Sequence, residues 1–190
     1  MRAFETEKTE VAEIDRSVYD IKDKVNAAFE VNSGLTAEIV EQISKEKHDP
    51  DWMREFRLKA LDIYNKASIP NWGPSLEGLD MRNIVTYVRP NTEMRGKWSE
   101  VPDDIKNTFE RLGIPQAERS SLAGVGAQYD SEVVYHNVKE EVAAQGVVYT
   151  DMESALTGPY ADMVKEHFMK CVPPTDHKFA ALHGAVWSGG

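Results

Sequence analysis

The segment DPDWMREFRLKALDIYNKA, residues 49–67, constrains the fold most, because it carries the strongest helix signal in the chain. Its apolar residues recur at helical spacing and share one face. These residues are Trp52, Phe56, Ala60 and Ile63, with Met53 and Tyr64 widening the face. Asp49 is a good N-cap, and Pro50 suits the first helical position because its missing N–H would have no partner there. We expect a helix that packs this face into a core or against a partner chain.

Other segments carry helix boundaries of the same kind. In LTAEIVEQISKEK, Thr36 is the expected N-cap, Leu35 and Val40 form a hydrophobic staple, and the helix ends near His48. Further helices are predicted in PDDIKNTFERLGIP, QAERSSLAG, NVKEEVAAQG, the two halves of ESALTGPYADMVKEHFMK, and a closing helix from near Asp176. Short strands are predicted in NIVTYVRP and VVYTD.

This pattern predicts an α+β fold that is mostly helical. Residues 1–33 mix charges without a sustained period, so we expect a loosely ordered arm there. Residues 34–100 form a helical amino-terminal region with a polar loop, and residues 101–190 a mixed α/β segment.

Charge excludes several classes of function. The chain has 22 Lys and Arg against 32 Asp and Glu, a formal charge of -10 that opposes binding to nucleic acid or anionic lipid. Its longest apolar run is FAAL, far short of the ~18 residues of a membrane span. Acidic residues throughout the first thirty positions do not fit a secretory signal. We expect a cytoplasmic protein with neither nucleic acid nor membrane as a partner.

Two glycines in LAGVGAQYDSE invite a phosphate-binding interpretation. Gly124 and Gly126 are not followed by the lysine and Ser/Thr of a phosphate loop, nor by the third glycine of a dinucleotide-binding turn. We interpret them instead as a turn in which glycine supplies unusual backbone angles. An enzyme using this loop is the weakest of three functional hypotheses.

The histidines and the single cysteine give no metal-binding pattern. The histidines are His48, His136, His167, His177 and His183. No pair has the i, i+4 spacing of a zinc-binding HExxH helix, and His177 and His183 would point to different sides of a helix. Cys171 rules out an internal disulfide and is expected to be a small buried residue.

Acidic clusters at Glu5–Asp15, Asp103-Asp104 and Glu140-Glu141 are interpreted as helix starts or solvated faces. From the residues alone, therefore, no residue is predicted to be catalytic or to bind a metal, and no cofactor-binding residue is identified.

Four stretches together resemble the amino-terminal part of the SufB proteins, iron-sulfur cluster assembly scaffolds of the SufB/SufD family. They are SGLTAEIVEQISKEK, WMREFRLKALDIYNK, LGIPQAERSSLAGVGAQYDSEVVYHNVKEEVAAQGVVYTDMESAL and KFAALHGAVWSGG. The similarity runs from about Tyr19 to Gly190, and LAGVGAQYDSEVVYHN distinguishes SufB from its paralogue SufD.

The resemblance implies a subunit of a cytosolic complex with SufD and the ATPase SufC that receives sulfur from a desulfurase. In that family a right-handed parallel β-helix and a SufC-docking domain follow the segment seen here, and the residues tied to the iron-sulfur cluster lie in those parts. Cys171 falls where SufB-like sequences usually carry an aliphatic residue, so no ligand role is transferred to it. The chain is expected to be no enzyme, to hold no cofactor, and not to build a cluster alone.

A second hypothesis is a free-standing helical module that binds Suf partners or a sulfur donor. In either case we expect Ser188-Gly189-Gly190 to be the corner leading into the β-helix, with residues 160–190 only weakly protected. Gene fission, a frameshift, an incomplete gene model, a cloned domain and an intein junction all fit an end at this corner.

Overall fold

A computed structural model describes residues 26–73, 75–113, 122 and 124–189 of the chain. In this part there are seven α-helices, two 3-10 turns and two small antiparallel sheets, which agrees with the predicted α+β class. In chain order the elements are β1 (Ala27–Glu30), α1 (Ala37–Glu46), α2 (Asp51–Lys66), η1 (Met81–Asn83), β2 (Val88–Pro90), η2 (Trp98–Glu100), α3 (Asp103–Arg111), β3 (Gly124–Tyr129), β4 (Glu132–Val138), α5 (Glu140–Ala143), α6 (Met152–Thr157), α7 (Ala161–His167) and α8 (Lys178–Val186).

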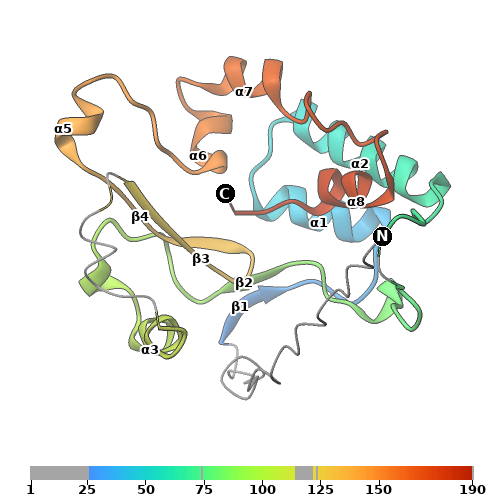
Figure 1. Cartoon of the computed structure of the whole chain (residues 1–190), viewed down its shortest axis with the longest axis horizontal. Coiled ribbons are helices and arrows are strands. Elements are labelled where there is room, and N and C mark those ends of the chain that lie inside the picture. The colour runs from blue at the N-terminus through green and yellow to red at the C-terminus, as the bar shows by residue number, and fades with distance from the viewer. Residues whose placement is uncertain (1–25, 74, 114–121, 123, 190) are drawn as a thin grey trace, which may run out of the picture.

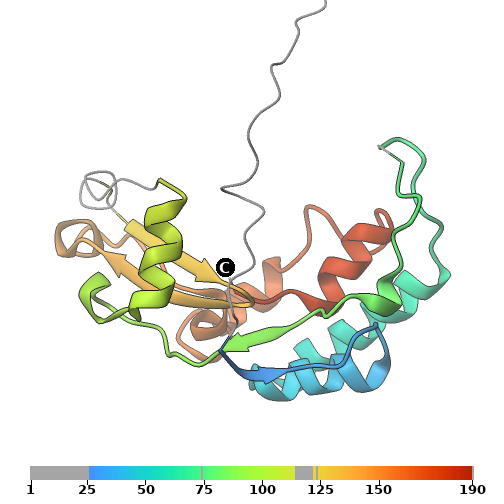
Figure 2. The ribbon, with the colours of Figure 1, turned by 90° about the horizontal axis from the view of Figure 1, so that it is seen from below.

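The elements form two groups joined by the β1–β2 sheet (Figures 1 and 2). Helices α1, α2 and α8 lie together in one group, and the β3–β4 hairpin with α3 makes the other. Helix α6 lies next to the chain end that follows α8 (Figure 1). No helix in the described ranges combines the length and apolar character needed to cross a membrane.

Helices α1 and α2 confirm the predicted helices. The Thr36 hydroxyl accepts from the Ile39 N–H at 3.4 Å, as an N-cap should. Helix α2 begins differently from the prediction, because Pro50 is the N-cap residue and the Asp49 carboxylate accepts from Arg57 Nε instead of capping the helix. The buried positions of α2 are Met53, Arg57, Ala60 and Leu61, so a charged side chain lies within the face expected to be apolar.

Helix α8 packs against α2 through small residues. Ala181 and Ala185 are completely buried, and Ala185 shares a core cluster with Ala60 of α2. The following Trp187 is buried beside Met53 and Leu156. The weak protection expected over residues 160–190 stays a prediction, but Ala181, Ala185 and Trp187 within that range lie in the core.

The sequence missed strand β1. It pairs antiparallel with β2, with Ala27 opposite Pro90 and Glu30 opposite Val88. The pairing continues beyond the strand, where the Val31 N–H donates to the Tyr87 carbonyl at 3.2 Å. The prediction of a loosely ordered arm is thus wrong for residues 27–31, whereas residues 1–25 lie outside the described part.

Strands β3 and β4 form a hairpin over the segment predicted as mixed structure. The turn places Asp130 in the left-handed region with φ of 53°. Val134 of β4 is buried against Val101 and Ile105, which brings α3 onto the hairpin. The Arg95 N–H donates to the Val134 carbonyl at 3.0 Å, so the segment before η2 runs along the other side of β4.

Some of the remaining predicted elements are present in the structure and others are not. Helices α3, α5 and α7 lie within the segments predicted, and α6 begins one residue before its segment. Gly113 and Gly146 have the positive φ typical of residues that follow a helix. VVYTD is not a strand, because residues 147–150 have no regular structure. The predicted helix QAERSSLAG falls almost entirely outside the described residues.

Candidate functional site

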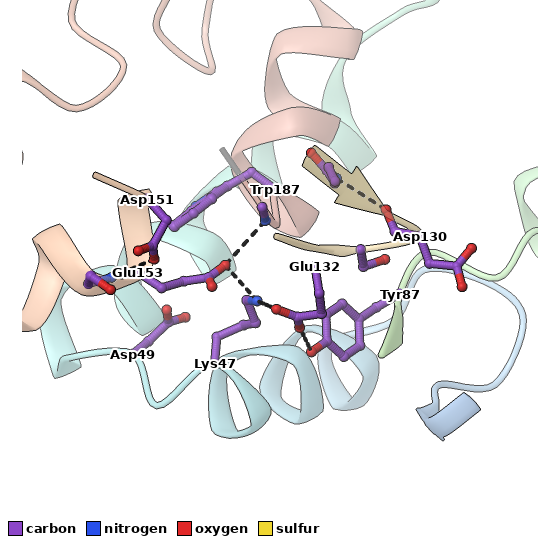
Figure 3. Close-up of polar contacts among 12 residues, drawn as sticks. Lys47, Asp49, Tyr87, Asp130, Glu132, Asp151, Glu153 and Trp187 are labelled. Carbon is purple, nitrogen blue, oxygen red and sulfur yellow. Dashed lines mark hydrogen bonds and ion pairs between the residues drawn. The ribbon is translucent and has the colours of Figure 1, made fainter. Parts of the chain in front are cut away.

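A buried lysine at the end of α1 is the centre of the main polar cluster. Lys47 is the C-cap residue of α1, and its side chain is only 2% exposed. Its ammonium pairs with Glu132 Oε2 at 2.7 Å and with Glu153 Oε1 at 2.5 Å (Figure 3). Because an unpaired buried cation is costly, both carboxylates are needed to balance its desolvation.

Tyr87 completes this cluster from the β1–β2 side. Its hydroxyl donates to Glu132 Oε1, and its ring lies 5.6 Å from the Lys47 ammonium (Figure 3). Burial, reinforced by the bond to Glu132, raises the pKa of Tyr87 well above its usual range. The hydroxyl therefore stays protonated and serves as a donor.

Glu153 ties the cluster to the carboxyl-terminal segment. Its Oε1 accepts from the Gly189 N–H at 3.2 Å. Glu153 stands in the first turn of α6, where Asp151 caps the helix by accepting from the Ser154 N–H at 2.8 Å. The carboxylates of Glu132 and Glu153 thus hold α6, β4 and the residues after α8 around one ammonium.

A second buried ion pair lies between α2 and the residues after α8. Arg57 Nε donates to Asp49 Oδ2 at 2.6 Å, and both side chains are fully buried. Arg57 Nη1 also donates to the Trp187 carbonyl at 2.8 Å, and the guanidinium lies 4.5 Å from the centre of the Trp187 ring. In the described part of the protein, Asp49 Oδ1, Arg57 Nη2 and Trp187 Nε1 have no hydrogen-bond partner.

Chemically, both clusters consist of charges paired with one another inside the fold. Their atoms link segments far apart in sequence, such as Lys47 with Glu132 and Arg57 with Trp187. Over the described ranges, no group of three or more His, Cys, Asp or Glu side chains is placed to hold a metal ion.

Sequence reasoning missed these residues, although a signal was present. Arg57 follows Met53 by four positions and precedes Ala60 by three, and Lys47 follows Ile43 by four. A charge that falls in the apolar phase of an amphipathic helix is either exposed at the edge of the face or buried with a partner. Glu132 and Glu153, the partners of Lys47, have no comparable signature in sequence.

The glycines of LAGVGAQYDSE do not form a turn. Gly124 and Gly126 lie in β3, and neither has a positive φ. They face Tyr149 instead: a Cβ on Gly124 would lie 2.8 Å from its ring, and one on Gly126 would lie 3.2 Å from its hydroxyl. The interpretation as a turn with unusual backbone angles is therefore wrong, since close approach of Tyr149 is what the glycines permit.

The predicted histidines and cysteine are arranged differently from expectation. Cys171 is exposed, not buried, because it lies in the turn after α7. It lines a pocket of about 450 Å³ together with His167, His177 and His183, so His177 and His183 do not face opposite sides. His48 follows α1 with a φ of 53°, and His136 stacks on Tyr149 at 4.8 Å between ring centres.

The acidic clusters at residues 103–104 and 140–141 occupy the first turns of α3 and α5, as predicted. The cluster Glu5–Asp15 lies outside the described residues.

Comparison with known proteins identifies relatives over most of the chain. The iron-sulfur cluster assembly protein SufB of Bacillus subtilis is 51% identical over 172 residues, which is 90% of this chain and 37% of that protein. An iron-sulfur cluster assembly SufBD family protein of Staphylococcus haemolyticus is 48% identical over the same shares. Another from Mycobacterium bovis is 44% identical over 186 residues, which is 97% of this chain and 22% of that protein.

The chain thus spans 22% to 37% of the length of these relatives. No protein-family model matches the chain, and no solved structure matches it. The resemblance to SufB drawn from the sequence is confirmed by the names and identities of these relatives.

Proposed function

Because nine-tenths of this chain is homologous to SufB and SufBD-family proteins, we propose that it acts in iron-sulfur cluster assembly as part of a SufB-type scaffold. The observation that carries the proposal is the 51% identity to the Bacillus subtilis SufB protein over 172 residues. In this proposal the chain forms the amino-terminal portion of the scaffold and leads into a right-handed parallel β-helix.

The role proposed for the described part is structural. Lys47 and Arg57 are each paired inside the fold, which favours holding segments together over reacting with a substrate. We therefore propose that this portion is not an enzyme and holds no cofactor of its own. An iron-sulfur cluster needs about four thiolate or equivalent ligands, and the chain has one cysteine.

The partners proposed for the whole scaffold are SufC, SufD and a sulfur-donating desulfurase, in the cytoplasm. These follow from the resemblance to the family. A free-standing module that binds such partners by itself is the alternative, and the pocket beside Cys171 favours it because it offers an accessible surface.

A chimera tests the proposal. The stretch of Bacillus subtilis SufB matched by this chain is replaced with the corresponding residues of this chain, in cells depleted of their own SufB. Growth and the activity of an iron-sulfur enzyme such as aconitase should be restored. The 190-residue chain expressed alone is the comparison, and it should restore neither.

Two results would contradict the proposal. One is a chimera that accumulates as folded protein yet restores nothing. The other is a stable, stoichiometric cluster chromophore on the chain alone after incubation with ferrous iron and sulfide, since this would show that it builds a cluster without the rest of a scaffold.

A further inference from the structure

The outward side of α8 carries two adjoining hollows that the ion pairs described above do not use. The larger, about 450 Å³, lies between the start of α8 and residues 167–172. The smaller, about 170 Å³, lies between α8 and the loop after α2, where Ile69 and Leu79 line it. Phe179 lines both, so the two hollows adjoin at this side chain, and together we name them the α8 groove.

The α8 groove is apolar and contains no acidic residue. None of the side chains lining either hollow is Asp or Glu, although the whole chain has a formal charge of -10. The larger hollow is bordered by Lys170, His167 and His183, all of them exposed. An apolar floor beside cationic or hydrogen-donating side chains complements a ligand that is both apolar and acidic.

Not every basic group at the groove is free to bind. The Lys178 ammonium donates to the Tyr64 and Ala67 carbonyls at 2.7 and 2.9 Å, so it satisfies the end of α2. Lys170, in contrast, forms no ion pair with a described residue and is the cation available to a ligand.

His177 presents a hydrogen-bond donor at the same place. Its Nδ1 accepts from the N–H groups of Phe179 and Ala180, each at 3.2 Å, so the proton of the neutral imidazole lies on Nε2. The nearest carboxylate to Nε2 is the exposed Asp176, at 3.6 Å. Trp72, 70% exposed, packs edge-on against His177 and extends the apolar surface.

We propose that the α8 groove binds an acidic peptide segment of a partner protein, with one apolar side chain in each hollow. Two hollows that share Phe179 suit consecutive anchors of a short helix or extended strand better than one compact small molecule. The groove has basic and no acidic lining residues although the chain as a whole is acidic, and this favours an acidic segment as the ligand. This proposal does not depend on the role in cluster assembly, and the chimera above does not test it.

Two matched synthetic peptides test the charge preference. Each has about twelve residues with Leu and Phe at helical spacing on one face. One carries Glu at the other positions, and its twin carries Lys there. Fluorescence anisotropy with the full chain should give a Kd on the order of 10–100 µM for the acidic peptide and at least about tenfold weaker binding of the basic one.

Variants on the exposed surface locate the site without disturbing the fold. Lys170→Glu should weaken the acidic peptide about tenfold, because it replaces the free cation of the groove with a like charge. Lys97→Glu is the matched control, since Lys97 is exposed before η2 and lines neither hollow. It should leave the Kd unchanged.

Cys171 gives an independent readout, because it is the only cysteine of the chain and it lines the groove. Alkylation by iodoacetamide should slow when the acidic peptide is bound and should proceed unchanged with the basic twin. The proposal is overturned by equal binding of the two peptides, by no binding, or by binding that leaves Cys171 fully reactive. Protection of Cys171 that rises with the concentration of the chain alone would also overturn it, since a second copy would then occupy the groove.

Discussion

Arg57 is a completely buried guanidinium whose charge is balanced by one carboxylate, that of Asp49. Its guanidinium also donates to the backbone carbonyls of Ala185 and Trp187 and lies over the Trp187 ring. Burying an ion pair costs desolvation that the Coulomb attraction barely repays, whereas removing one member leaves an unpaired buried charge. The consequence is an asymmetry between single and double substitutions at this pair.

We predict that Arg57→Met lowers the free energy of unfolding by about 3–5 kcal/mol, because Asp49 is then buried without its partner. The double variant Asp49→Leu/Arg57→Met should lose much less free energy of unfolding than the two single variants lose in sum. Urea denaturation followed by circular dichroism measures all three against the wild type.

Arg54→Met is the control for Arg57→Met, since Arg54 lies on the same helix and pairs with Glu41 at the surface. Exposed ion pairs contribute little, so its unfolding midpoint should stay near that of the wild type. The prediction is contradicted if Arg54→Met and Arg57→Met lower the free energy of unfolding equally. It is also contradicted if the losses at Asp49 and Arg57 add up in the double variant, since burial would then not explain what the pair contributes to stability.

At the scale of elements, the contact between α2 and α8 depends on a glycine. A Cβ added to Gly184 would lie 3.0 Å from Ala60 Cβ and 3.3 Å from both Phe56 and Pro174. Glycine inside a helix is itself unfavourable by roughly 1 kcal/mol relative to alanine. Its presence here is explained by the close approach of the two helices.

We predict that Gly184→Val destabilises the protein by about 2–3 kcal/mol, because its two methyl groups force α8 away from α2. Thermal unfolding and the near-ultraviolet circular dichroism of the aromatic side chains report the change. Gly96→Val is the comparison, since no atom lies within 4 Å of a Cβ there and its φ is not positive. A Gly184→Val protein as stable as Gly96→Val would show that the helices are not in close contact.

The predictability of each element followed from the kind of signal that defines it. Helices α1 and α3 were predicted because caps, acidic first turns and apolar spacing are local. Strand β1 depends on pairing with residues far along the chain, as Ala27 does with Pro90, and this leaves no local pattern. The β3–β4 hairpin pairs residues close in sequence, such as Tyr129 with Glu132, but its glycines were interpreted as a turn and not as part of a strand. VVYTD has strand-forming residues but pairs with no strand in the described ranges, and its Tyr149 instead covers the glycines of β3.

The same distinction applies to the polar clusters. Lys47 and Arg57 are charged residues at apolar positions of the helical pattern, and this could be read from the sequence. Glu132 and Glu153, however, are 85 and 106 residues away from Lys47. Only the fold selects them as partners among 32 acidic residues. The α8 groove is likewise assembled from three segments. The histidines could be seen in the sequence, but not the surface that they share.

At the scale of the whole molecule, Lys47 connects the two groups of elements. It projects from the end of α1 in the helical group and pairs with Glu132 at the start of β4 and Glu153 in α6 (Figure 3). Beyond this ammonium, the hairpin is joined to the β1–β2 sheet by Ser131, whose N–H donates to the Val88 carbonyl at 3.1 Å. Removal of the Lys47 ammonium should therefore weaken the coupling between the unfolding of the helical group and that of the hairpin.

We predict that Lys47→Met uncouples the hairpin from the helical group. Glu132 and Glu153 would lose their shared cation at a cost of about 3 kcal/mol, near the low end for breaking a buried pair because both carboxylates are partly exposed. Amide hydrogen exchange in β3 and β4 should then accelerate about 100-fold, while α2 and α8, held by Arg57 and their own apolar contact, should change far less. Lys66→Met, which removes an exposed pair with Asp62, should leave both groups unchanged.

Two outcomes would contradict this prediction. If exchange in α2 and α8 accelerated as much as in the hairpin, Lys47 would stabilise the molecule as a whole without being the link between its groups. No acceleration anywhere would mean that the cluster around Lys47 contributes no net stability.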